Sequence, residues 1–133
     1  MLKFDMDRQE KVTFWKQASK SDLETMELIF AGKKYSDALF FGHLATEKML
    51  KAVYIQKKDE VFPAIHDLLK IAMLSGLKMD KETKDELEVV TGFNINARYD
   101  SYKHEFYDRA TRQYTTRYIK FIKSFIKWLQ KQI

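Results

Sequence analysis

Hydrophobic residues recur at intervals of three and four positions over five segments of the chain, which is the spacing of one face of an α-helix. None of these segments alternates apolar and polar residues as a half-buried β-strand does. The long segments span residues 7–31, 36–57 and 108–132, and the short ones span residues 66–76 and 80–93. The pattern predicts an all-α protein, an up-and-down bundle of three long and two shorter helices. At 133 residues the chain is expected to form a single domain over residues 1–133.

The second long segment, residues 36–57, is apolar on nearly every face, which is typical of a helix at the centre of a bundle. The first long segment instead has one apolar stripe and is expected to end at Gly32. Asp22 falls on this stripe, at a position where an apolar residue is expected. It is either a paired and partly buried carboxylate or a residue at the edge of the stripe that reaches water.

His43, Glu47 and Lys51 lie four residues apart and form the one polar line of the second segment. Histidine and glutamate are metal ligands, but the sequence places no third ligand beside them. We therefore expect an ordinary polar stripe and no metal site. His66, at the start of the next segment, is expected to make a hydrogen bond at a helix end.

The predicted helices are interrupted by the segment TGFNINARYDSYKHEFYD, residues 91–108, which carries several aromatic side chains together with arginine, lysine and histidine. We expect this connection to lack regular secondary structure of its own. Long irregular connections are uncommon inside compact domains and often carry function. The functional residues are therefore expected in this segment.

The C-terminal part of the chain is strongly basic, with nine Lys or Arg residues against three Asp or Glu residues from Arg98 onward. In the last predicted helix, aromatic side chains recur at heptad spacing, which is typical of a core or dimer contact. The basic residues of this region follow another face and form a ridge: Arg109, Arg112, Lys120, Lys123, Lys127 and Lys131. Such a basic ridge indicates either an anionic partner, such as a nucleic acid, or a solvated outer face.

Composition excludes several classes of protein. The chain has no cysteine, which rules out disulfide bonds and cysteine-ligated metals. It has no apolar run near the roughly 20 residues of a transmembrane helix, and its N-terminus has no signal-peptide core. We expect a cytoplasmic protein that contains no cofactor.

The chain also resembles a known family. The stretch FWKQASKSDLETMELIFAGKKYSDALFFGHLATEKMLKAV, a histidine that opens HDLLKIA, and FNINARYDSYKHEFY before a tryptophan-containing last helix are similar to the HEPN domain. The order and spacing of the elements A-x-x-x-D-L, Y-S-D-A-x-F and T-E-K-x-L-K-A carry the resemblance. It implies a helical bundle that commonly forms homodimers and is often encoded beside a minimal nucleotidyltransferase as a toxin–antitoxin pair.

The resemblance also implies a site. Active members of the family are metal-independent ribonucleases with an arginine followed, after four to six residues, by a histidine, and Arg98 and His104 match this pattern. The arginine would stabilise phosphate charge, and the histidine would act as acid or base at the ribose 2′-hydroxyl. Tyr99 follows the arginine, where active members usually have a small polar residue. Phe106 stands where some members have a tyrosine that the transferase modifies with AMP, and Tyr107 comes one residue later.

Three functional hypotheses follow. The first is a binding module, a HEPN dimer that engages a nucleotidyltransferase, a nucleotide or RNA. Its candidate binding residues, besides Arg98, are Tyr99, Tyr102, Lys103, Tyr107, Arg109 and Arg112. The alternative is an active ribonuclease in which Arg98 and His104 are catalytic, although in one continuous helix these two residues would point about 240° apart. The third is a dimeric helical scaffold in which Arg98 pairs with a carboxylate.

Overall fold

The computed structural model describes residues 6–133, and these residues form six α-helices and no β-strand. The helices are α1 (Arg8–Ala31), α2 (Tyr35–Lys57), α3 (Leu68–Leu74), α4 (Lys81–Arg98), α5 (Asp100–Arg109) and α6 (Arg112–Lys131). The predicted all-α bundle is therefore confirmed. Within the described residues, no helix combines the length and apolar character needed to cross a membrane. We find no signal-peptide pattern in the sequence at the N-terminus. Residues 1–5 of that stretch lie outside the described residues.

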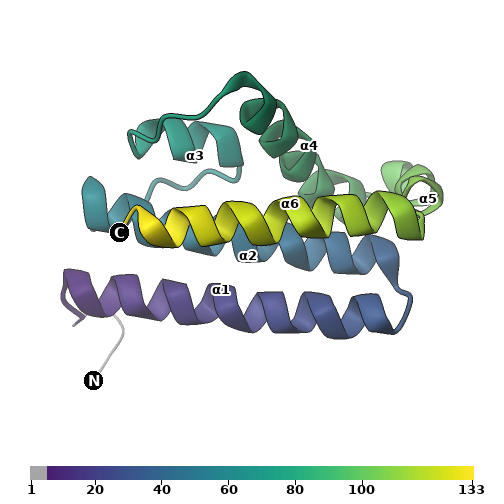
Figure 1. Cartoon of the computed structure of the whole chain (residues 1–133), viewed down its shortest axis with the longest axis horizontal. Helices are drawn as coiled ribbons and strands as arrows, with labels where there is room; N and C mark the ends of the chain where they lie inside the picture. The colour runs from purple at the N-terminus through teal and green to yellow at the C-terminus, as the bar shows by residue number, and fades with distance from the viewer. Residues whose placement is uncertain (1–5) are drawn as a thin grey trace.

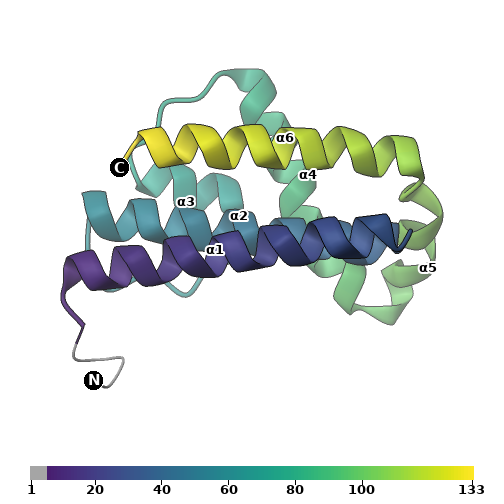
Figure 2. The ribbon, with the colours of Figure 1, turned by 60° about the horizontal axis from the view of Figure 1, so that its bottom comes forward.

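Helix α2 is the central element, as its apolar composition predicts. It contacts α1, α3, α4, α5 and α6. The long helices α1, α2 and α6 run side by side, and α3 and α4 cover α2 from another side (Figure 1). Two views agree that the α1–α2 turn, α5 and the start of α6 lie at the same end of the bundle (Figures 1 and 2).

Of the two alternatives for Asp22, the structure shows the paired and partly buried carboxylate. Its Oδ2 atom lies 2.6 Å from Nζ of Lys48 on α2, and only 9 % of the residue is exposed. About one turn earlier, the buried hydroxyl of Ser19 donates a hydrogen bond of 2.7 Å to the carbonyl oxygen of Ala45. These two bonds fix the position of α1 along α2, because each joins one particular turn of α1 to one turn of α2.

Helices α1, α2 and α6 approach one another at Gly42, in the middle of α2. A Cβ atom at this position would lie 2.6 Å from Cδ1 of Ile122 on α6 and 3.1 Å from Sδ of Met26 on α1. Both neighbours are fully buried. Glycine in a helix interior reduces stability by itself, so the close approach of the two neighbouring helices explains its presence here.

His43 and Glu47 of the polar line of α2 are buried, and this corrects the expectation of an ordinary polar stripe. His43 is fully buried, and its Nδ1 atom lies 3.2 Å from the carbonyl oxygen of Val90 on α4. Both His43 Nε2, at 3.3 Å, and His66 Nδ1, at 2.9 Å, lie near the same oxygen of Glu47. The other Glu47 oxygen lies 3.8 Å from Nζ of Lys51. The sequence spacing shows that the polar residues share a face, but only the tertiary fold shows that α4 and the α2–α3 connection cover it.

The cluster of His43, Glu47 and His66 thus joins α2 to the α2–α3 connection, and His43 extends it to α4. The expected hydrogen bond of His66 is present, and its partner is the Glu47 carboxylate. Residues 6–133 contain no group of three or more His, Asp or Glu residues that could hold a metal ion.

Residues 91–108 are helical, and the expectation of an irregular connection is wrong. Helix α4 continues to Arg98, and α5 follows after the single residue Tyr99. The rings of Phe93 and Phe106 stack with their centroids 5.4 Å apart. In one straight helix these two residues would lie roughly 20 Å apart and about 220° around the axis, so only a break brings both rings into the core. No proline or glycine marks the break, which is why the sequence pattern does not reveal it.

Helix α6 begins at Arg112, four residues later than predicted. The hydroxyl of Thr111 accepts a hydrogen bond of 3.2 Å from the N–H of Tyr114 and caps the helix. Within the aromatic stripe, Tyr118 and Phe125 are buried. The stripe therefore contributes to the core, which is one of the two roles that its spacing indicates.

Candidate functional site

Arg98 is the last residue of α4, and its side chain is exposed. Its guanidinium forms no hydrogen bond or ion pair with any residue from 6 to 133. Its five N–H donors are therefore available to water or to an acceptor outside these residues. The described residues therefore do not support the scaffold hypothesis, in which Arg98 pairs with a carboxylate of this chain.

Tyr99 both ends α4 and begins α5. Its backbone is extended, with φ −103° and ψ 125°. Its N–H donates to the carbonyl oxygen of Ile95, and its own carbonyl oxygen accepts from the N–H groups of Tyr102 and Lys103, at 3.0 and 3.1 Å. The side chains of Tyr99 and Tyr102 are exposed. The turn therefore places two accessible aromatic rings directly after Arg98.

Helix α5 presents most of its side chains to solvent, because Phe106 is its one buried residue. Lys103 and Tyr107, four residues apart, lie on one face. Nε2 of the exposed His104 lies 3.4 Å from Oδ2 of Asp108 in the next turn. A carboxylate in this position can orient the imidazole ring for proton transfer.

Lys103, His104 and Tyr107 form one wall of an open cavity of about 550 Å³, a volume typical of ligand sites. The other wall comes from the α1–α2 turn and the first turn of α2: Lys33, Lys34, Ser36 and Asp37. Three lysines and one aspartate line this space, so the cavity is positive at neutral pH. We call it the α1–α2/α5 cavity.

The structure does not bring all the predicted site residues together. Arg98 is not among the described residues that line the α1–α2/α5 cavity. Arg109, at the end of α5, lies beside Tyr114, where burial raises the pKa of the Tyr114 hydroxyl and the guanidinium acts against this rise. Arg112 lines a separate depression of about 480 Å³, whose other residues are Gln113, Thr116, Arg117 and Lys120. The predicted residues are therefore distributed over several positions at one end of the bundle.

The basic ridge of α6 is partly neutralised within the chain. Lys123 pairs with Glu27 of α1 at 3.2 Å. Arg117, which lies beside the ridge, pairs with Glu86 of α4 at 2.8 Å. Five of the six members of the ridge are exposed and form no ion pair with a described residue: Arg109, Arg112, Lys120, Lys127 and Lys131. Most cations of the ridge are therefore free to meet an anionic ligand.

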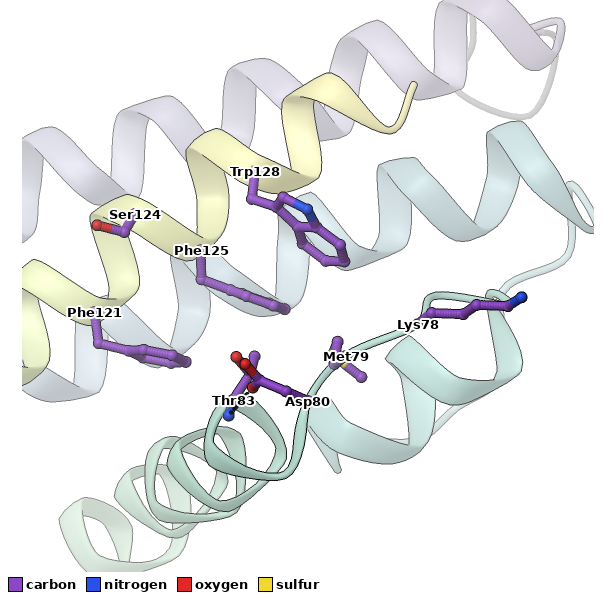
Figure 3. Close-up of a pocket in the computed structure, with 8 residues that line it drawn as sticks. All are labelled: Lys78, Met79, Asp80, Thr83, Phe121, Ser124, Phe125 and Trp128. Carbon is purple, nitrogen blue, oxygen red and sulfur yellow. Dashed lines mark hydrogen bonds between the residues drawn. The ribbon is translucent and has the colours of Figure 1, made fainter.

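A further cavity, of about 360 Å³, lies between α6 and the connection from α3 to α4 (Figure 3). Phe121, Phe125 and Trp128 contribute their rings to it from α6. The carboxylate on its rim, Asp80, accepts a hydrogen bond of 2.8 Å from the N–H of Thr83 and caps α4. This cavity offers mainly apolar surface, and none of the predicted site residues lies in it.

A model of the HEPN domain matches residues 12–132, almost the whole chain. The chain belongs to the HEPN family. The fold of this HEPN domain is similar to the crystal structure of TT1696 from Thermus thermophilus, with a TM-score of 0.78. The similarity covers 92 % of this chain and 98 % of TT1696 at 15 % sequence identity, and it therefore concerns the fold alone. No curated protein matches the sequence.

Family membership indicates a function related to nucleotides or RNA. Within this HEPN domain, sequence reasoning finds Lys103, His104 and Tyr107 but misses the opposite wall of their cavity. The signal in the sequence is the pair Lys33 and Lys34 directly after a helix end. Nothing in the sequence shows that this turn lies beside α5, more than sixty residues later in the chain.

Proposed function

We propose that this HEPN domain is a nucleotide- and RNA-binding module that acts with a nucleotidyltransferase subunit in a cytoplasmic toxin–antitoxin system. The observation that carries the proposal is the exposed Arg98 guanidinium, which has no hydrogen-bond or ion-pair partner within residues 6–133. A guanidinium matches the geometry of a phosphate, because two parallel N–H groups can donate to two phosphate oxygens.

The surroundings of Arg98 support a nucleotide ligand. Tyr99 and Tyr102 follow it immediately and expose their rings, and a nucleobase can stack on such a ring whatever its identity. On α5, Lys103 adds a cation and Tyr107 a third exposed ring. A phosphate contact with neighbouring aromatic rings is the arrangement that binds single-stranded nucleic acid without strict sequence preference.

The proposal includes a homodimer. Ile95 and Tyr99, one helical turn apart at the end of α4, are both large hydrophobic residues that the single chain leaves exposed. Exposed apolar residues that are grouped together often mark a protein interface. We therefore expect light scattering to give twice the mass of one chain, whereas a monomer at micromolar concentration would contradict this part of the proposal.

Replacing Arg98 by alanine is expected to weaken RNA binding about tenfold or more, because it removes a charge-assisted contact to phosphate. Fluorescence anisotropy with a labelled single-stranded oligoribonucleotide measures the effect. Arg98→Lys keeps the charge but loses the two-pronged geometry, so it should recover binding only in part. Lys57→Ala serves as the control, because it removes a cation in the last turn of α2. Its RNA affinity should stay close to that of the wild type. Equal affinities for Arg98→Ala and the wild type would refute the role of Arg98.

The partner is tested separately. When the chain is co-expressed with the nucleotidyltransferase encoded by a neighbouring gene, we expect the two proteins to purify together as a stable complex. The complex should survive gel filtration at moderate salt concentration. If the two proteins elute separately at every salt concentration, the domain has another partner and this part of the proposal fails.

A second function, a metal-independent ribonuclease, is favoured by the accessible imidazole of His104, whose Nε2 atom lies 3.4 Å from the Asp108 carboxylate. Because Arg98 does not line the cavity of His104, we propose that the second subunit of a dimer completes the site. We expect cleavage of RNA in the presence of EDTA, with a loss of about 100-fold or more for His104→Ala. Asp108→Asn should reduce the rate less, because it affects only the orientation of the ring. Intact RNA after prolonged incubation with wild-type protein would exclude this activity and leave the binding module.

A further inference from the structure

Lys33 has an unusual backbone conformation at the end of α1. Its φ of 63° lies in the left-handed region, where it is the only residue other than glycine among those described. The N–H of Lys34 donates to the carbonyl oxygen of Ile29 and the N–H of Lys33 to that of Phe30, which is the Schellman pattern of a helix end. In this pattern the left-handed position is usually glycine.

The glycine of this turn stands one residue too early to relieve the strain. Gly32 has φ −79° and ψ 4°, a conformation that any residue can adopt. The chain therefore has a lysine where the backbone favours glycine and a glycine where it is not needed. A strained residue of this kind indicates that its side chain has a function beyond the fold.

The side chain of Lys33 lines the α1–α2/α5 cavity, together with Lys34 from the same turn and Lys103 from α5. None of these three lysines forms an ion pair or a side-chain hydrogen bond with a residue from 6 to 133. Asp37 is the one acidic residue of the lining. Three lysines without an ion-pair partner among the described residues, from two separate elements, therefore line a space that is large enough for a small anion.

The first turn of α2 reinforces this charge. Lys34 occupies the N-cap position and makes no side-chain bond to the helix, so no side chain satisfies the first N–H groups of α2. The positive end of the helix dipole lies at the same point. On the opposite wall, the exposed ring of Tyr107 offers a flat surface to a nucleobase.

We propose that the α1–α2/α5 cavity binds a phosphate group of a nucleotide, with Lys33, Lys34 and Lys103 as its ligands and Tyr107 stacked on the base. The proposal rests on the nucleotide-related function proposed above and adds a second phosphate position, distinct from that of Arg98. The phosphate can belong to an internal position of RNA or to the polyphosphate of a nucleoside triphosphate. The chemistry is the same in both cases, and the test separates them.

The test compares two pairs of adjacent lysines at opposite ends of α2. In one variant Lys33 and Lys34 become glutamine, and in the control variant Lys57 and Lys58 become glutamine, which gives the same change in net charge. Lys57 and Lys58 are exposed and form no ion pair with a described residue. Fluorescence anisotropy with a labelled single-stranded oligoribonucleotide, lacking terminal phosphates, is measured at several salt concentrations.

We expect K33Q/K34Q to bind the oligoribonucleotide at least tenfold more weakly than the wild type. The slope of log affinity against log salt concentration should fall by about 0.7, because the cavity neutralises one phosphate and each phosphate of a single strand contributes about 0.7. K57Q/K58Q should keep the wild-type affinity and slope. Equal losses in the two variants would show an effect of overall charge and overturn the proposal.

Adenosine triphosphate and inorganic triphosphate, used as competitors, identify the source of the phosphate. If either of them displaces the oligoribonucleotide from the wild type at micromolar concentration, and less effectively from K33Q/K34Q, the cavity takes a polyphosphate. If neither competes while K33Q/K34Q still weakens RNA binding, the cavity takes an internal phosphate of RNA. Both results support the proposal.

Lys33→Gly separates binding from folding. Glycine relieves the left-handed strain, so the midpoint of thermal unfolding should stay the same or rise, while RNA binding weakens. A lysine retained only for the fold would give the opposite result, a lower midpoint with unchanged binding, and this would overturn the proposal.

If Arg98→Ala weakens RNA binding but K33Q/K34Q does not, the cavity proposal fails and the proposed function stands. If the wild type binds no nucleotide or RNA, both fail.

Discussion

Replacing Gly42 by valine is expected to lower the free energy of unfolding by about 3 kcal/mol. The first added atom already lies 2.6 Å from Cδ1 of Ile122 and 3.1 Å from Sδ of Met26, and valine adds two methyl groups beyond it. Both neighbours are fully buried in a packed core, so α1 and α6 must move apart to admit the new side chain. Urea unfolding followed by circular dichroism at 222 nm measures the change.

Two variants make this result specific to the close approach at Gly42. A Cβ atom at Gly92 on α4 would have only Asn96 near it, at 3.7 Å, which is an ordinary contact. Gly92→Ala should therefore leave stability unchanged or raise it by up to about 1 kcal/mol, because alanine favours the helix. The free energy of unfolding of Gly42→Ala should lie between those of Gly42→Val and Gly92→Ala. A Gly42→Val variant as stable as the wild type would show that the helices are not held as close as the structure indicates.

Replacing Glu47 by glutamine is expected to lower the free energy of unfolding at neutral pH by about 2 kcal/mol. The carboxylate is nearly buried and contacts the side chains of His43, His66 and Lys51 at the same time. Glutamine has nearly the same shape, but it carries no charge and has one acceptor oxygen instead of two. The buried ring of His43 would then lose the charge that faces it, and the hydrogen bond from His66 of the α2–α3 connection would lose its charged acceptor.

The same variant should also change the response to acid. Burial raises the pKa of Glu47, but hydrogen bonds and charge attraction from His43 and His66 together outweigh it, so the pKa lies below its ordinary value of 4.5. Because the folded-state pKa is below the unfolded-state pKa, Glu47 stabilises the fold above about pH 4.5. This contribution is lost as the pH falls through the folded-state pKa. Below pH 4.5 the wild type should therefore lose stability more steeply than Glu47→Gln.

Asp85→Asn provides the matched control for Glu47→Gln. Asp85 also pairs with a cation, Lys81 at 2.9 Å, but both side chains are exposed. An exposed pair within one helix contributes little, so the loss should be much smaller than that of Glu47→Gln. If Glu47→Gln and Asp85→Asn have equal and small effects, the cluster around Glu47 does not hold the α2–α3 connection in place.

The fold was predictable from the sequence because helices depend on periodicity along the chain. The central position of α2 follows from an apolar surface on nearly every face, and the end of α1 at Gly32 follows from its capping chemistry. The cap of α4 by Asp80 is equally local, since its carboxylate accepts from an N–H three residues ahead. In each case the interacting residues are near neighbours in sequence.

The break at Tyr99 was not predictable in this way. The break allows Phe93 to stack on Phe106 in the core. This contact depends on the packing of the whole core and not on any turn residue. A continuous helix would have the same local pattern of residues. The sequence predicted a functional segment at residues 91–108, which stays a prediction, and it gave this segment the wrong conformation.

The candidate site shows the same division. The sequence by itself determined an all-α HEPN bundle and identified Arg98, Lys103, His104 and Tyr107 as residues with chemistry suited to phosphate. Only the tertiary structure decided that Arg98 is free of partners among the described residues and that the α1–α2 turn supplies the second wall of the cavity beside α5. The physical reason is that helical periodicity is a property of neighbouring residues, whereas a cavity between distant segments depends on how whole helices pack against each other.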